Sequence, residues 1–120
     1  MELLISHRNN VCEIKLNRPE VFNSFNKAMA LALQKALDEC EKNDDVRAIV
    51  ITGEGKAFCA GQDLAEATDP NGPELKMIVK EHYNPIIERI RNIDDNLQIK
   101  KLLDFLKTNF NTNNRENNID

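Results

Sequence analysis

The sequence lacks the features that would indicate a membrane, secreted or metal-binding protein. No apolar run approaches the roughly 20 residues that span a bilayer, and the apolar stretch at the N-terminus is far too short for a signal-peptide core. The three cysteines form no Cys-x-x-Cys pair, which argues against a disulfide framework and against a zinc site. We therefore expect a cytoplasmic protein with reduced, buried thiols and no bound metal.

Glycine and proline are scarce, and their distribution divides the chain. All four glycines and all four prolines, together with every alanine and valine, lie in residues 1–91. The remainder contains none of these types and is rich in Asn, Lys, Ile and Leu. We expect one globular unit at 1–91, a helical segment at 92–110, and a disordered tail at 111–120, where too few apolar residues offset the ordering entropy.

The basic residues form no stripe along the chain. The formal net charge is -4, and the basic residues are scattered among acidic ones. A nucleic-acid partner is not expected, because such proteins present a basic patch or stripe. A membrane surface is not expected either, since no segment combines a basic face with a strongly apolar one.

Residue patterns predict a mixture of strands and helices. A short β candidate at 3–6 and alternating apolar residues at 11–16 flank an Asn-rich turn, which predicts a β-hairpin. Asn26 is the expected N-cap of an Ala-rich amphipathic helix that ends near residue 43. The nearly continuous apolar run at 46–52 predicts a central strand that is covered on both faces.

A second amphipathic helix is predicted between Leu75 and Ile90. Apolar residues recur there at helical spacing, and His82 lies on the same stripe. Pro85 falls inside this helix and should kink or split it near Asn84, because proline has no N–H to donate. We interpret His82 as a partly buried side chain with satisfied hydrogen bonds.

The loop at 53–64 follows the predicted central strand and holds three of the four glycines. Glycine is typical of positions where the backbone bends sharply or approaches another group closely. The spacing of Gly53-Glu54-Gly55-Lys56 does not match a Walker A phosphate loop. An ordinary strand-to-helix turn, with Asp63 as N-cap, is one interpretation of this loop. Cys59 has no identifiable base beside it, so packing is its expected role.

The order of these segments resembles a known family. The hairpin, the Asn-Arg-Pro-Glu loop at 17–20, the Ala-rich helix, Val-Ile-Thr-Gly at 50–53 and Phe-x-Ala-Gly-x-Asp-Leu at 58–64 resemble the N-terminal half of the crotonase, or enoyl-CoA hydratase/isomerase, superfamily. Asp69-Pro70-x-Gly72-Pro73 and Tyr83-Asn84-Pro85 resemble its phenylacetate-degradation branch, which isomerises 1,2-epoxyphenylacetyl-CoA. The resemblance covers residues 1–91 and implies an α/β fold, an incomplete crotonase-type spiral of ββα units.

The resemblance also implies a substrate and a site. The substrate is an acyl-CoA thioester, so coenzyme A belongs to the substrate and no separate cofactor is expected. Charge develops on the thioester oxygen, and preorganised backbone N–H groups stabilise it. The implied catalytic donor is the Ala60 N–H, and Gly61 lets the thioester approach the backbone. The implied substrate- and CoA-binding residues are Glu20, Phe22, Lys56, Ala60, Gly61, Gln62, Asp63 and Leu64.

Two further parts of the family's catalytic site have no counterpart in the sequence. The family takes a second oxyanion N–H from a Gly-rich segment and an acid/base carboxylate from beyond it, and nothing after Arg91 resembles either. We therefore expect a truncated family protein that is inactive alone. The alternatives are a non-catalytic CoA-binding or interaction module that assembles with full-length crotonases, which typically form trimers, and an active enzyme made of two chains. Homo-oligomers or association with relatives are the expected protein contacts.

Overall fold

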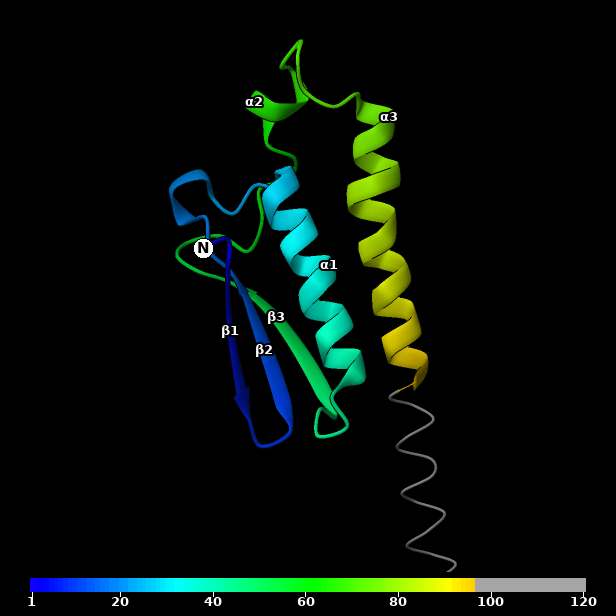
Figure 1. The fold of residues 1–120 in the computed structure, drawn as a ribbon. Helices are drawn as coiled ribbons and strands as arrows, with labels where there is room; N and C mark the ends of the chain where they lie inside the picture. Colours follow the sequence, from blue (N-terminus) through cyan, green and yellow to red (C-terminus); the bar gives the residue numbers. More distant parts are fainter. Residues whose placement is uncertain (97–120) are drawn as a thin grey trace, which may run out of the picture.

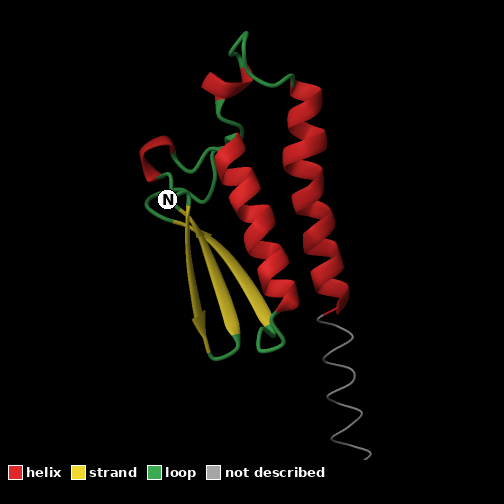
Figure 2. Ribbon diagram, in the orientation of Figure 1, coloured by secondary structure: helices red, strands yellow, loops and turns green. Residues whose placement is uncertain are grey.

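The computed structural model describes residues 1–96, and in this part of the chain a small mixed sheet carries helices on one face (Figures 1 and 2). In chain order the elements are β1 (Leu3–Arg8), β2 (Val11–Leu16), the 3-10 turn η1 (Pro19–Val21), α1 (Lys27–Lys42), β3 (Ala48–Gly53), α2 (Leu64–Ala67), α3 (Leu75–Ile78) and the π-helical segment η2 (Val79–Tyr83). The chain stays helical from there to residue 96. The expected α/β class is confirmed. Most of the predicted segment 92–110, and all of 111–120, lies outside the described residues.

The predicted hairpin forms from β1 and β2. The two strands pair antiparallel, with Leu3 opposite Leu16. Asn9 and Asn10 form the turn with φ angles of 51° and 68°, the left-handed values that a two-residue type I′ turn requires and that Asn tolerates. Local sequence therefore accounts for both the turn and the register.

β3 pairs parallel with β2 and gives the strand order β1-β2-β3. It is thus an edge strand among the described residues, and its side chains are half-buried or exposed; Val50 is 43% exposed. The prediction of a central strand covered on both faces is wrong for this part of the chain. A run of β-branched residues predicts a strand, whereas its cover depends on neighbours that the local pattern does not specify.

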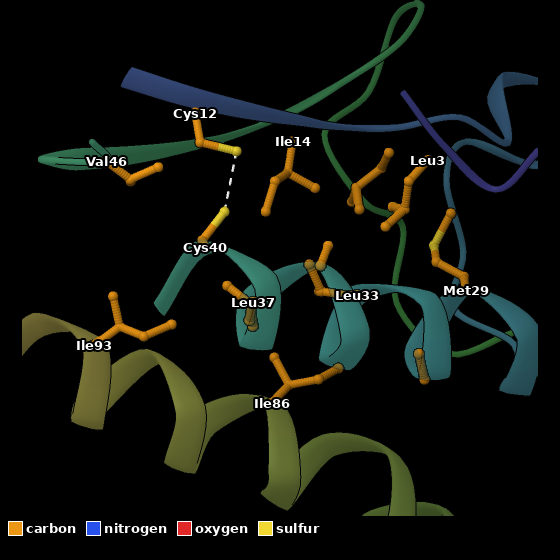
Figure 3. Packing of buried hydrophobic residues seen from close by; sticks show 13 residues of the cluster. Leu3, Cys12, Ile14, Met29, Leu33, Leu37, Cys40, Val46, Ile86 and Ile93 are labelled. Carbon is orange, nitrogen blue, oxygen red and sulfur yellow. Dashed lines mark hydrogen bonds between the residues drawn. The ribbon is translucent and has the colours of Figure 1, made fainter. Parts of the chain in front are cut away.

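The core lies between the sheet and α1. β2 alternates strictly, and its inward residues Cys12, Ile14 and Leu16 are fully buried. They pack against the inner face of α1 (Figure 3), which buries Met29, Ala30, Leu33, Ala36, Leu37 and Cys40. The Asn26 side chain accepts a hydrogen bond from the Met29 N–H at 2.9 Å, so the predicted N-cap is confirmed.

Two of the three free thiols meet in this core. Cys12 Sγ and Cys40 Sγ lie 3.1 Å apart (Figure 3). Burial, followed by the contact with Cys12, raises the pKa of Cys40 to about 12. This thiol therefore stays protonated at neutral pH.

The second helical stretch packs beside α1 (Figure 1). It buries Ile78, His82, Ile86 and Ile93, which share one face, while Leu75 is 66% exposed. The irregularity predicted before Pro85 takes the form of η2, so the helix widens locally and does not break. Ile93 belongs to the core cluster, although it follows the change of composition at Arg91.

Candidate functional site

The two loops that the sequence singled out lie together at one end of the sheet. We name residues 17–26 the first loop and residues 53–63 the second loop. An isolated parallel bridge joins Phe25 to Gln62: the Phe25 N–H donates to Gly61 O at 2.8 Å, and the Asp63 N–H donates to Phe25 O at 2.7 Å. Segments more than thirty positions apart in the sequence thus form one surface.

A fully buried asparagine fixes the spacing of the loops. Asn23 Nδ2 donates to Glu54 O at 3.0 Å and to Ala57 O at 2.9 Å, both in the second loop. Its Oδ1 accepts from the Arg18 N–H at 2.7 Å. Every polar atom of this side chain is therefore used, as burial of an amide requires, and the φ of 58° is one that Asn tolerates.

An ion pair also joins the two loops. Arg18 Nη2 lies 3.0 Å from Asp63 Oδ2, and both side chains are largely buried. Arg18 also donates to Ser24 O. The hydrogen bond from Arg18 is the main reason that the pKa of Asp63 is lowered from its usual value. Asp63 also caps α2 by accepting from the Glu66 N–H, so the predicted capping role is confirmed.

The residues predicted to bind substrate are brought to this surface with different exposures. Glu20, Lys56, Ala60 and Gly61 are exposed, as are Phe22 (54%) and Leu64 (74%), whereas Gln62 and Asp63 are half-buried. The turn before Lys56 abuts the first loop, because a Cβ on Gly55 would lie 3.1 Å from the Pro19 Cβ. Gly61 has a φ of 118°, and a Cβ there would meet no atom within 4 Å.

The Ala60 N–H, the predicted oxyanion donor, already has an acceptor. It donates to Phe22 O at 2.9 Å, so it can serve a ligand only if that bond breaks. The bridge turns the Gln62 N–H to the side away from Phe25, because N–H directions alternate along an extended segment. No atom of the described residues accepts from the Gln62 N–H. Of the Ala60 and Gln62 N–H groups, the one that is free to meet a ligand is therefore that of Gln62.

Sequence reasoning missed the side chains that hold the loops. Arg18 was part of a family-like segment, and Asn23 part of a polar stretch, but neither was given a role. The Arg18–Asp63 pair could have been sought as two opposite charges in two loops of one site. The Tyr83 hydroxyl donates to Gln62 Oε1, which local sequence gives no means to predict.

Two reactive residue types near the loops have structural surroundings. His82 is 4% exposed, so it is more deeply buried than predicted. Its Nδ1 lies 4.0 Å from Glu66 Oε1, which is longer than a hydrogen bond, and satisfied hydrogen bonds of this side chain remain a prediction. Cys59 Sγ lies 3.8 Å from Gly61 O and packs against the core. Among residues 1–96, no three His, Cys, Asp or Glu side chains are grouped to hold a metal ion. No helix of this part of the chain has the length and apolarity of a transmembrane span.

Comparison with known proteins identifies the family of this loop pair. The family model for enoyl-CoA hydratase/isomerase matches residues 6–97. The chain belongs to the enoyl-CoA hydratase/isomerase family. It is 42% identical over 97 residues to the 1,2-epoxyphenylacetyl-CoA isomerase of Escherichia coli, covering 78% of this chain and 37% of that protein. It is 36% identical over 88 residues to the trans-2-decenoyl-(acyl-carrier-protein) isomerase of Streptococcus mutans, covering 71% of this chain and 34% of that one.

Solved structures of this family share the fold. The enoyl-CoA hydratase EchA8_6 of Mycobacterium marinum matches with a TM-score of 0.62 and 35% identity, over 74% of this chain and 42% of that one. An enoyl-CoA hydratase/isomerase of Pseudoalteromonas atlantica matches with a TM-score of 0.63 and 28% identity, over 75% of this chain and 34% of that one. The chain thus spans about a third of the length of the curated relatives it matches.

Proposed function

We propose that the two loops bind an acyl-CoA thioester and that the Gln62 N–H donates to the thioester oxygen. One observation carries the proposal: the bridge to Phe25 directs this N–H to the side away from Phe25, and no backbone carbonyl of the described residues accepts from it. A preorganised backbone N–H stabilises an oxygen that gains negative charge. Gln62 takes the role predicted for Ala60, whose N–H is occupied by Phe22 O.

The coenzyme A portion extends from the thioester over the exposed surface of the loops. Lys56 is exposed and carries a compact positive charge, suited to a phosphate of coenzyme A. Phe22 presents an exposed aromatic ring, a face on which the adenine base can stack. Glu20 and Leu64 flank these contacts. The open space beside Gly61 leaves the thioester free to approach the backbone.

The acyl group we propose is the ring-epoxide of phenylacetyl-CoA, the substrate named for the Escherichia coli relative. We further propose that this chain performs no turnover by itself. The sequence has no glycine after Gly72, so it lacks the Gly-rich segment expected to supply a second N–H. A single donor stabilises the developing charge only in part.

Titration calorimetry with phenylacetyl-CoA, which lacks the reactive epoxide, tests the binding proposal. Saturable binding is expected, with weaker binding of free coenzyme A. The variant Gly61→Val should lose the binding while it keeps the circular dichroism spectrum, because valine does not adopt a φ of 118°. Absence of binding to the unmodified chain would overturn the proposal. Isomerisation or hydration above the level of a heat-denatured sample would refute inactivity, provided that Gly61→Val abolishes it.

A second candidate function is association with copies of this chain or with full-length relatives. The edge of β3, with which no strand of residues 1–96 pairs, favours it, together with a cavity of about 140 Å³ between β3, α1 and the second helical stretch. Its lining is mostly apolar: Leu37, Ile49, Ile51, Ile90, Ile93 and Asp94. An uncovered strand edge beside apolar surface promotes association. Sedimentation of the chain alone should show species larger than the free chain, and the mixture with the Escherichia coli relative should show species larger than those of either protein alone. A monomer boundary for the chain alone, together with unchanged boundaries for both proteins in the mixture, would contradict this candidate.

A further inference from the structure

We propose that Tyr83 is a positioning residue that fixes the direction of the Gln62 N–H, an inference that rests on the function proposed above. Tyr83 contacts both partners of the bridge between the loops. Its hydroxyl donates to Gln62 Oε1. Its ring packs edge-on against Phe25, with ring centroids 5.8 Å apart and an interplanar angle of 83°. One side chain of the second helical stretch therefore holds the two residues whose pairing aims the free N–H.

The other end of the Gln62 amide is also held. Gln62 Nε2 lies 3.4 Å from Glu66 Oε1. The second oxygen of Glu66 accepts from the Lys27 N–H at 2.9 Å, in the first turn of α1, where a carboxylate is favoured by the helix dipole. The side chain of Gln62 is thus fixed at both ends, which restricts rotation of the adjacent backbone.

The helix irregularity beside Pro85 fixes Tyr83 in turn. Pro85 has no N–H, so the carbonyl of Glu81, four residues earlier, lacks its α-helical donor. Gln34 Nε2 from α1 donates to Glu81 O at 2.8 Å and to His82 O at 3.2 Å. Tyr83 ends the π-helical segment, and such segments frequently occur at functional sites. The irregular turn is therefore anchored to α1 directly beside the positioning residue.

A change at Tyr83 should affect the contact with the thioester carbonyl and not the contacts with the rest of coenzyme A. A hydrogen bond weakens steeply as its angle departs from linearity, so a freely moving Gln62 donates poorly to the thioester oxygen. Contacts to the phosphates and the base do not pass through Gln62. Loss of the Tyr83 hydroxyl should therefore weaken the binding of thioesters more than the binding of analogues without the carbonyl.

The test compares two ligands that differ in the carbonyl alone: phenylacetyl-CoA and its thioether analogue S-(2-phenylethyl)-CoA. The full chain and the variant Tyr83→Phe, which keeps the ring against Phe25, are titrated with both. The variant should bind the thioester about 3- to 10-fold more weakly, the range of one neutral hydrogen bond, and the thioether within about twofold of the unmodified chain. Thr68→Val is the matched control, because it removes a hydroxyl that donates only to Leu64 O in α2; both affinities should stay unchanged.

Each outcome of this titration bears on one proposal. If Tyr83→Phe weakens the binding of both ligands equally, Tyr83 has a purely structural role and the inference is overturned. Unchanged affinities for both ligands would also overturn it. If the unmodified chain binds neither ligand, or binds both equally, the proposed function fails instead. The two failures are distinguished by the unmodified chain alone.

A measurement without ligand tests the same inference separately. The Asp63 N–H donates to Phe25 O within the bridge, so its hydrogen exchange reports how firmly the bridge is held. Tyr83→Phe should speed this exchange by about the same 3- to 10-fold and leave the exchange of the Met29 N–H, in α1, unchanged. Gln62→Met removes the acceptor of the Tyr83 hydroxyl, so it should give the same acceleration, and the double variant no more. An additive double variant would show that Tyr83 does not act through Gln62.

Discussion

The layer of β2 and α1 and the pair of loops are stabilised in different ways. The layer has apolar side chains that alternate along β2 and recur along α1, and these side chains are almost completely buried. The loops are joined by a short backbone bridge and by a few polar side chains, chiefly Asn23 and the Arg18–Asp63 pair. Apolar packing is distributed over many contacts, whereas each polar link between the loops is made once. The geometry of the site should therefore depend on single residues in a way that the fold does not.

The largest effect is expected in the buried layer. Leu37 is 1% exposed, and Leu37→Ala should lower the free energy of unfolding by about 3 kcal/mol through lost contacts and a residual cavity. Leu31 lies on the same helix but is 45% exposed, so Leu31→Ala should cost less than about 1 kcal/mol. Urea unfolding followed by circular dichroism measures both. Equal losses would show that α1 does not pack as described.

Replacement of Asn23, one of the polar links between the loops, should lower the free energy of unfolding nearly as much as the loss of a core side chain. Asn23→Ala leaves two carbonyls and one N–H of the loops without partners, and should lower the free energy of unfolding by about 2 kcal/mol. Asn9 has a similar φ but lies in the exposed hairpin turn, so Asn9→Ala controls for backbone strain and should cost about 1 kcal/mol. Urea unfolding measures the difference. A smaller loss for Asn23→Ala than for Asn9→Ala would contradict the cross-linking role.

Because of the Arg18–Asp63 pair, the stability of the fold should depend on pH in the acidic range. Because Arg18 lowers the pKa of Asp63 in the folded state, the pair stabilises the fold above about pH 4, the ordinary pKa. This contribution is lost as the pH falls through the lowered value. Asp63→Asn should lower the free energy of unfolding by about 1 to 2 kcal/mol at pH 7 and flatten the pH dependence of stability below about pH 4.

The pair of Asp38 and Arg89 provides the control for this experiment. Its side chains are 43% and 30% exposed, so solvent screens the interaction, and Asp38→Asn should cost less than about 1 kcal/mol. Thermal unfolding across the pH range measures both variants. An unchanged acid dependence in Asp63→Asn would show that another carboxyl group is responsible.

The smallest effect concerns the thiols, because labelling them reports on the layer and on the loops without a substitution in either. Cys59 belongs to the second loop and is half-buried, whereas Cys12 and Cys40 are buried in the layer. At pH 8 a thiol reagent should modify Cys59 first, because reaction requires an accessible thiolate and the raised pKa keeps Cys40 protonated. Mass spectrometry of the labelled peptides measures the order. Modification of Cys40 before Cys59 would mean that the layer opens more readily than the loops.

Features that depend on neighbouring residues were predicted from the sequence, and features that depend on contacts between distant segments were not. The Asn-rich turn and the N-cap at Asn26 were predicted correctly, because each depends on residues within a few positions of one another. The irregularity before Pro85 was anticipated for the same reason, since a missing N–H is a local fact. The edge position of β3 was not, because an apolar run does not specify which strands lie beside it. The Glu20, Phe22 and Lys56 contacts with coenzyme A remain predictions.

The sequence alone determined the secondary structure, the family and the two loops that form the site. These follow from side-chain periodicity, capping and turn residues, and a loop motif, all of which act over short stretches of chain. Only the tertiary structure decided which of the Ala60 and Gln62 N–H groups is free, because the Ala60 N–H is satisfied by Phe22 O and the Gln62 N–H is turned away from Phe25. Both partners lie in the other loop. The direction of a backbone donor is set by pairing across space, and a one-dimensional pattern does not contain that pairing.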